Sequence, residues 1–167
     1  AELLLNETLQ TDVISARGKS YGVEVLLKKS SGKLSGWISY TYARSLLQAD
    51  GDFLDEQINS GEYYHSNFDQ PHTVAVVSNF KVNRRVNISL NVNYSTGRPT
   101  TLPITKYEIK DQPVLLFTDR NKFRIPDYFR TDIAFNFEGN HKVNKRIHGS
   151  WSFSVYNLTS RANAYSV

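Results

Sequence analysis

The 167-residue sequence has no cysteine, and its hydrophobic residues never form a long uncharged run. The absence of cysteine excludes disulfides, thiolate nucleophiles and cysteine-based zinc or iron–sulfur sites. The absence of an apolar run of about 20 residues excludes a transmembrane helix. If this chain crosses a membrane, it must therefore cross it with strands.

Motifs of catalysis and of cofactor binding are also missing. The sequence contains no HExxH pair, no nucleophile elbow and no glycine-rich phosphate loop after a strand. One acidic run, in an expected loop, lacks the EF-hand spacing of calcium ligands, so we favour a solvated loop there. We expect no enzyme activity, no cofactor and no metal. The weak metal candidates are Asp50, Asp52, Asp55, Glu62 and His65.

The charge distribution argues against nucleic acid as a partner. The formal net charge is +4, but the basic residues gather in expected turns at 28–33, 81–85 and 142–146. A nucleic-acid surface would instead carry them along a strand face among exposed aromatics. The sequence also begins without an initiator methionine or signal peptide, and it ends where a further alternating segment starts. We therefore expect it to be a piece of a longer chain.

What the sequence does contain is regular alternation of apolar and polar residues. In Val86 to Ser95, valine, isoleucine, leucine and tyrosine occupy every second position, and asparagine or serine the positions between. A period of two is typical of a strand whose two sides meet different environments. Five other segments share the pattern, so we expect an all-β, antiparallel, up-and-down meander. The six expected strands are 21–29, 34–42, 73–80, 86–95, 129–138 and 147–156.

The connections between these strands alternate between short and long. Two long loops are expected, at 43–72 and 96–128, and the other connections are short. Outer-membrane barrels have short turns at one end and long loops at the other. A ten-residue strand tilted near 45° climbs about 23 Å, close to the apolar band of about 25 Å on such barrels. The pattern therefore favours a segment of a large transmembrane β-barrel, with 1–167 as a single fragment.

The parity of the side chains assigns each residue to one of two faces. An apolar middle flanked by two rows of aromatics is typical of a surface that faces lipid. The expected lipid-facing residues are Val23, Val25, Ile38, Val74, Val76, Ile88, Leu90, Val92, Ile133 and Phe153. The expected aromatic girdles are Tyr21, Tyr40, Tyr42, Tyr94 and Phe129 at one end, with Phe80 and Phe137 at the other.

The opposite face is polar but carries little lysine or glutamate. A soluble sheet usually shows water a charged face, whereas a hydrated barrel lumen accepts small neutral groups. The expected lumen-facing residues are Glu24, Asn87, Ser89, Asn91, Asn93, Arg130 and Asp132. Arg130 and Asp132 lie two residues apart on this face and are candidates to pair with each other or with neighbouring strands. The alternative is a soluble β-sandwich or small barrel that buries the apolar face as a core and binds ligands with its long loops.

Five segments together resemble a known family. They are YGVEVLLKKSSGKLSGWISYTYARS at 21–45, FDQPHTVAVVSNFKV at 68–82, YSTGRPTTLP at 94–103, IPDYFRTDI at 125–133 and VYNLTSRANAY at 155–165. This ordered series resembles the carboxy-terminal part of the β-barrel of TonB-dependent outer-membrane receptors of the Bacteroides type. The resemblance covers nearly the whole chain.

The resemblance implies TonB-dependent import of a scarce ligand, such as a siderophore, glycan, peptide or vitamin, across the outer membrane of a Gram-negative cell. In that family a barrel of about 22 strands is closed by a plug. The implied partners are outer-membrane lipid, the remaining strands and plug of the same receptor, and the TonB energy-transducing complex. A surface lipoprotein is a further candidate partner. None of these properties follows from periodicity alone.

Overall fold

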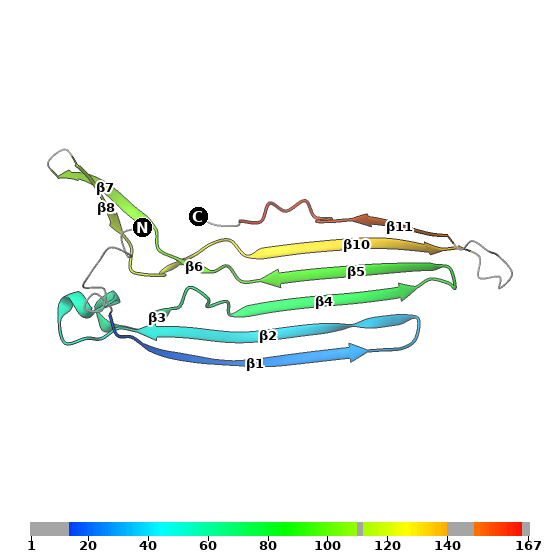
Figure 1. Cartoon of the computed structure of the whole chain (residues 1–167), viewed down its shortest axis with the longest axis horizontal. Coiled ribbons are helices and arrows are strands. Elements are labelled where there is room, and N and C mark those ends of the chain that lie inside the picture. Colours follow the sequence, from blue (N-terminus) through cyan, green and yellow to red (C-terminus); the bar gives the residue numbers. More distant parts are fainter. Residues whose placement is uncertain (1–13, 110–111, 140–148, 165–167) are drawn as a thin grey trace. The chain divides into compact units, whose positions relative to one another are not determined.

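The computed structural model describes residues 14–109, 112–139 and 149–164. The described chain is mostly antiparallel β-structure, and its main sheet follows the order β1-β2-β4-β5-β10-β11 (Figure 1). A short strand, β3, pairs with β2 beside this path. The expected all-β antiparallel meander is therefore confirmed, and its closure into a barrel stays a prediction.

The bounds of the main strands are close to those expected. They are β1 (Arg17–Lys29), β2 (Leu34–Gln48), β3 (Tyr64–His65), β4 (His72–Lys81), β5 (Val86–Ser95), β10 (Tyr128–Glu138) and β11 (Ser150–Val155). The bounds of β5 agree at both ends with the alternating segment, because the alternation there has no exception.

Two strands extend further than the alternation predicted. β1 starts at Arg17 and not at Tyr21, and β2 continues to Gln48 and not to Tyr42. The extension of β2 has a pairing partner, since Leu46 lies opposite His65 of β3. Such pairing stabilises an extended backbone even where side chains no longer alternate. The expected sixth strand, 147–156, is shorter in the structure, and residues 147 and 148 lie outside the described residues.

The two expected long loops contain ordered structure of their own. The first holds two short 3₁₀ segments, η2 (Leu54–Glu56) and η3 (Asn59–Gly61). The second holds a hairpin of β7 (Pro103–Ile109) and β8 (Gln112–Phe117), and a short pair formed by β6 (Pro99–Thr100) and β9 (Phe123–Arg124). The sequence patterns did not predict these short elements within the two long connections.

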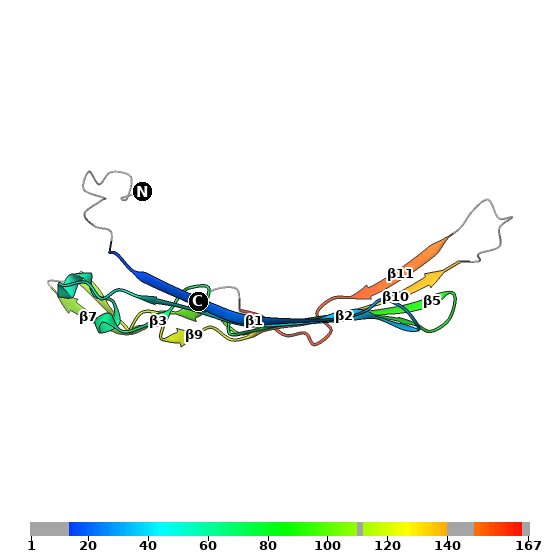
Figure 2. The same ribbon diagram turned by 90° about the horizontal axis from the view of Figure 1, so that it is seen from below.

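The chain divides into two compact units. The first, called the loop unit below, comprises Ala1–Tyr21, Ser45–Asp69 and Pro99–Arg124. The second, the sheet unit, comprises Gly22–Arg44, Gln70–Arg98 and Ile125–Val167. Within the sheet unit the strands lie in a single layer (Figure 2).

A hydrophobic core is nearly absent from the described part of the chain. Among the described residues, its buried apolar side chains are few: Ala49, Tyr64 and Pro99 in the loop unit, and Pro71 in the sheet unit. Large apolar side chains of the sheet unit stay exposed, among them Ile38 at 47%, Phe153 at 64% and Trp151 at 81%. A soluble domain of this length normally buries most of its large apolar residues, so this sheet lacks the covering that such a domain has.

Candidate functional site: a two-faced sheet and its end clusters

The apolar face is continuous across the sheet because the strands pair in register. Ile38, Val76 and Val92 lie opposite one another on β2, β4 and β5. One row along, Leu90 of β5 lies opposite Ile133 of β10. Directly opposite residues of an antiparallel pair point to the same side. The residues expected on one face from β2 to β11 therefore do share one face.

Aromatic residues bracket this face at both ends of the strands. At the end nearest the long connections, one row runs across β2, β4, β5 and β10. Its members, each opposite the next, are Tyr40, Val74, Tyr94 and Phe129. At the other end, Phe135 lies opposite Phe153 and Phe137 opposite Trp151. The two rows are six to eight residues apart along the strands, or about 20–26 Å at 3.3 Å per residue.

Tyr40 and Tyr42 also contact His72 at the first of these ends. The Tyr40 hydroxyl lies 3.0 Å from Nδ1 of His72, and the two rings stack with centroids 6.2 Å apart. The Tyr42 ring lies 5.5 Å from the same imidazole. This rim is therefore built of amphipathic rings, the residue type enriched where a membrane meets water.

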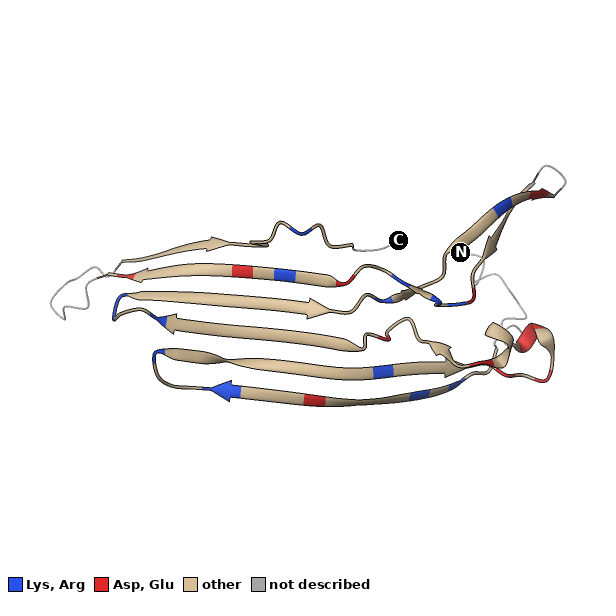
Figure 3. Ribbon diagram, turned by 180° about the vertical axis from the view of Figure 1, so that it is seen from behind, with Lys and Arg blue, Asp and Glu red and all other residues tan. Residues whose placement is uncertain are grey.

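On β4, β5, β10 and β11 the opposite face carries few charges and is internally hydrogen-bonded. Ser89 donates to Asn79 Oδ1 at 2.7 Å, and Ser152 donates to Asn136 Oδ1 at 2.7 Å. Asn136 Nδ2 lies 3.4 Å from the Ser89 hydroxyl, which links the two pairs across β4, β5, β10 and β11. Apart from Arg130 and Asp132, charged residues on these four strands stand only at the strand ends (Figure 3).

Arg130 and Asp132, which the sequence singled out, contact each other directly. Arg130 Nε donates to Asp132 Oδ1 at 2.8 Å, and the same oxygen accepts from the backbone N–H of Asn157. The Arg130 guanidinium also lies 5.5 Å from the ring centroid of Tyr156. Of the two pairings left open by the sequence, the structure shows the one between these two residues, and its geometry fixes the point where β11 ends.

Three of the family-like segments meet at one cluster in the sheet unit. Asp127 accepts from the Tyr94 hydroxyl at 2.7 Å and from the Gly97 backbone N–H at 2.9 Å. Arg161 donates to the Asp127 carbonyl at 2.9 Å. A Cβ on Gly97 would lie 1.7 Å from the carbonyl oxygen of Ile125, so only glycine fits this close approach. Sequence reasoning missed Asp127 as the centre of this cluster, although it lies in one of the segments that carry the resemblance.

The Asn163 side chain makes the backbone hydrogen bonds of Phe129 on β10 that a neighbouring strand would otherwise make. Its Oδ1 accepts from the Phe129 N–H at 3.0 Å, and its Nδ2 donates to the Phe129 carbonyl at 3.0 Å. These are the two bonds that a neighbouring strand would make with that residue. No sequence pattern indicates this role, because the asparagine lies outside any alternating segment.

In the loop unit, a buried carboxylate links the two long connections. Asp69 is 1% exposed and forms an ion pair with Arg124, whose Nη1 also donates to the Asp69 carbonyl at 2.6 Å. The Ser45 N–H donates to Asp69 Oδ1 at 2.7 Å, and His65 Nδ1 lies 3.5 Å from Oδ2. This latch holds segment 45–69 to segment 99–124.

The weak metal candidates are not brought together. Asp50 forms an ion pair with Arg17, which lowers the pKa of that carboxyl, mainly through the hydrogen bond. His65 faces Asp69 instead of the acidic run. Among the residues described, no three histidine, aspartate or glutamate side chains are grouped closely enough to hold a metal ion.

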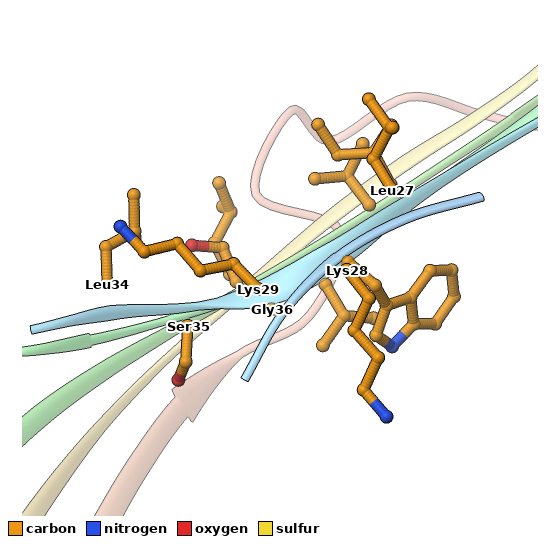
Figure 4. A pocket seen from close by; sticks show the side chains of 12 residues that line it. Leu27, Lys28, Lys29, Leu34, Ser35 and Gly36 are labelled. Atoms are coloured by element: carbon orange, nitrogen blue, oxygen red, sulfur yellow. The ribbon is translucent and has the colours of Figure 1, made fainter. Parts of the chain in front are cut away.

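A hollow of about 490 Å³ surrounds Gly36. Figure 4 shows Leu27 and Leu34 on one side of the strands there, and Lys28 and Ser35 on the other. A Cβ on Gly36 would lie 2.1 Å from the Val77 carbonyl oxygen, so the missing side chain lets β2 and β4 approach closely. Because residues of both faces border the hollow, we interpret it as the space left by the missing side chain of Gly36 and not as a ligand pocket.

Comparisons with family models, with curated proteins and with solved structures found no match to this chain. The helical segments in the described ranges are also too short or too polar to span a membrane.

Proposed function

We propose that this chain forms part of the wall of an outer-membrane β-barrel that imports a scarce ligand in a TonB-dependent manner. The observation that carries the proposal is a single-layer sheet with an exposed, in-register apolar face bounded by aromatic rows. In water, such a face would be an aggregation surface. Against lipid, it is the surface that a transmembrane barrel requires.

The polar face supports the same proposal from the other side. On β4, β5, β10 and β11 several of its serine and asparagine side chains hydrogen-bond to one another, and the internal charges of these strands, Arg130 and Asp132, are paired. A water-filled lumen accepts such a surface without the lysine and glutamate that solubility demands of a free sheet. The proposed wall therefore has lipid on one side and water on the other.

The sheet order implies further strands. β1 and β11 stand at the two ends of the main sheet, with one neighbour each among the described strands. Unpaired edges are unstable in a membrane, where each free backbone group costs several kcal/mol. We propose that additional strands of the same receptor pair with these edges, and that a plug and the TonB complex supply gating and energy.

The alternative is a soluble β-sandwich or small barrel whose long loops bind a ligand. The compact loop unit, with its buried Asp69–Arg124 pair, is the feature that favours it. That alternative requires a second layer over the apolar face. The structure describes no such layer within the sheet unit.

A spin-label scan along β5 separates the two proposals. Because the chain has no native cysteine, single cysteines at 87–92 of the full-length protein can each carry a nitroxide without background from this segment. In membranes we expect labels at 88, 90 and 92 to collide mainly with oxygen, and labels at 87, 89 and 91 mainly with a water-soluble nickel complex. Labels at 88, 90 and 92 that are shielded from both would instead indicate a soluble core.

A further inference from the structure

The loop unit contains an open hollow of about 550 Å³, within the size range of small-molecule sites. It lies where segment 45–69 meets segment 99–124. Its polar side chains are those of Asn67, Thr100, Thr101, Thr118, Arg120 and Asn121, and Pro99 completes the lining.

The back of this hollow is held in place by buried hydrogen bonds. Asn121 is 5% exposed, and its Nδ2 donates to the His65 carbonyl and to Asn67 Oδ1, both at 2.7 Å. Its backbone has φ of 58°, a left-handed conformation that asparagine tolerates better than most residues. The amide of Asn59 holds both backbone groups of Arg120, at 2.7 and 2.9 Å. The hollow is therefore preorganised.

Apart from the Asn121 amide, which donates two internal hydrogen bonds, the internal bonds of the lining use its acceptors and leave its donors. Asn67 Oδ1 and Thr101 Oγ1 accept from Asn121, and Thr118 Oγ1 accepts from the Leu102 N–H at 3.2 Å. The hydroxyl hydrogens of these threonines and the amide hydrogens of Asn67 stay available to donate. A lining rich in donors fits a ligand rich in acceptor oxygens.

The charge of the hollow comes from Arg120. Three other cations of the loop unit form ion pairs: Arg124 with Asp69, Lys122 with Asp119 at 2.8 Å, and Arg17 with Asp50. The Arg120 guanidinium makes no salt bridge with any acid among the described residues, and it borders the hollow. Guanidinium groups bind carboxylates bidentately, with two parallel hydrogen bonds.

We propose that this hollow binds a saccharide that carries a carboxylate, such as a uronic acid unit. Arg120 takes the carboxylate, and the threonine hydroxyls and the Asn67 amide donate to ring and hydroxyl oxygens. An apolar ligand is disfavoured because Pro99 is the one apolar residue of the lining. The inference names the ligand class of the proposed importer, and to that extent it rests on the proposed function.

The test is a calorimetric titration of the detergent-solubilised full-length protein with three probes: trigalacturonate, uncharged maltotriose, and acetate. We expect trigalacturonate to bind more tightly than the other two. Arg120→Gln should weaken this binding about 10- to 100-fold, the loss expected for a charge-assisted hydrogen-bonded pair. Lys122→Gln is the matched control and should leave it unchanged, because that amine lies outside the lining and pairs with Asp119. Thr100→Val, which removes one hydroxyl at similar volume, should weaken it less.

Three results would overturn the inference. Maltotriose binding of equal strength, unaffected by Arg120→Gln, would show that the site does not recognise a carboxylate. Acetate binding of equal strength would show that the saccharide part of the ligand contributes nothing to binding. No binding of trigalacturonate would remove the site, while the spin-label scan of β5 would still decide separately whether the sheet is a membrane wall.

Discussion

Replacing Leu90 with arginine tests the apolar face at its centre. Leu90 lies four residues from both Val86 and Tyr94 on β5, or about 13 Å along the strand from either. With a strand tilt near 45°, each distance corresponds to about 9 Å along the membrane normal. Leu90 therefore lies near the middle of the proposed apolar band, with Ile133 and Ser78 beside it.

The expected cost follows from this depth. Arginine at the midplane of a lipid-facing barrel surface costs about 2–4 kcal/mol, whereas near the interfaces it costs about 0–1 kcal/mol. The matched control is Asn91→Arg, one residue along on the polar face, for which we expect a loss within about 0.5 kcal/mol. The predicted difference between two adjacent substitutions of β5 is therefore at least about 1.5 kcal/mol.

A third variant separates lipid from a packed core. A soluble core would also be destabilised by Leu90→Arg, but it would lose about 1–3 kcal/mol from Leu90→Phe through overpacking. Lipid chains adapt to the larger ring, so the account predicts almost no loss for Leu90→Phe. The assay is denaturant unfolding of the full-length protein from phospholipid vesicles, followed by tryptophan fluorescence. Equal losses for Leu90→Arg and Asn91→Arg, or a loss above about 1 kcal/mol for Leu90→Phe, would refute the reasoning.

Three further predictions concern the end clusters. Asp69→Asn removes the buried charge partner of Arg124 and should lower the stability of the loop unit by about 2 kcal/mol or more. The measurement is limited proteolysis, in which the long loops of the variant should be cleaved earlier. Unchanged cleavage would show that the Asp69–Arg124 contact is dispensable. Gly97→Ala should lower the unfolding midpoint, since its Cβ has no room, and an unchanged midpoint would contradict the close approach. Arg17→Gln should return the lowered pKa of Asp50 toward its ordinary value, measured by carboxyl carbon NMR. The Arg17–Asp50 pair stabilises the fold at pH values above the unfolded pKa of aspartate, about 3.9, and this contribution is lost as the pH falls through the lowered pKa of Asp50. An unshifted Asp50 resonance in the variant would argue against the pair.

Periodicity could predict the sheet because each strand of the sheet unit has two different sides. β5 alternates without exception, so its bounds were predicted correctly. The extension of β2 to Gln48 was not predictable in the same way. Its backbone pairs with β3, a two-residue strand that has no pattern of its own.

The clusters depend on contacts between residues far apart in the sequence. The pairing of Arg130 with Asp132 could be predicted, because two residues on one strand face are neighbours by geometry alone. Asp69 and Arg124 are 55 residues apart, and nothing local marks them as partners. The same holds for Asn163 and Phe129, whose bonds exist only because β11 ends early and the chain turns back to β10.

The most direct test of the account asks what touches the apolar face in the cell. A photoreactive benzophenone side chain replaces Phe153 in one full-length variant and Ser154 in another, and irradiated cells are analysed by mass spectrometry. These adjacent residues of β11 lie opposite Phe135 and Ala134 and so point to opposite faces. The account predicts phospholipid or lipopolysaccharide adducts at 153 and none at 154. Peptide adducts at 153, or lipid adducts at both positions, would contradict it.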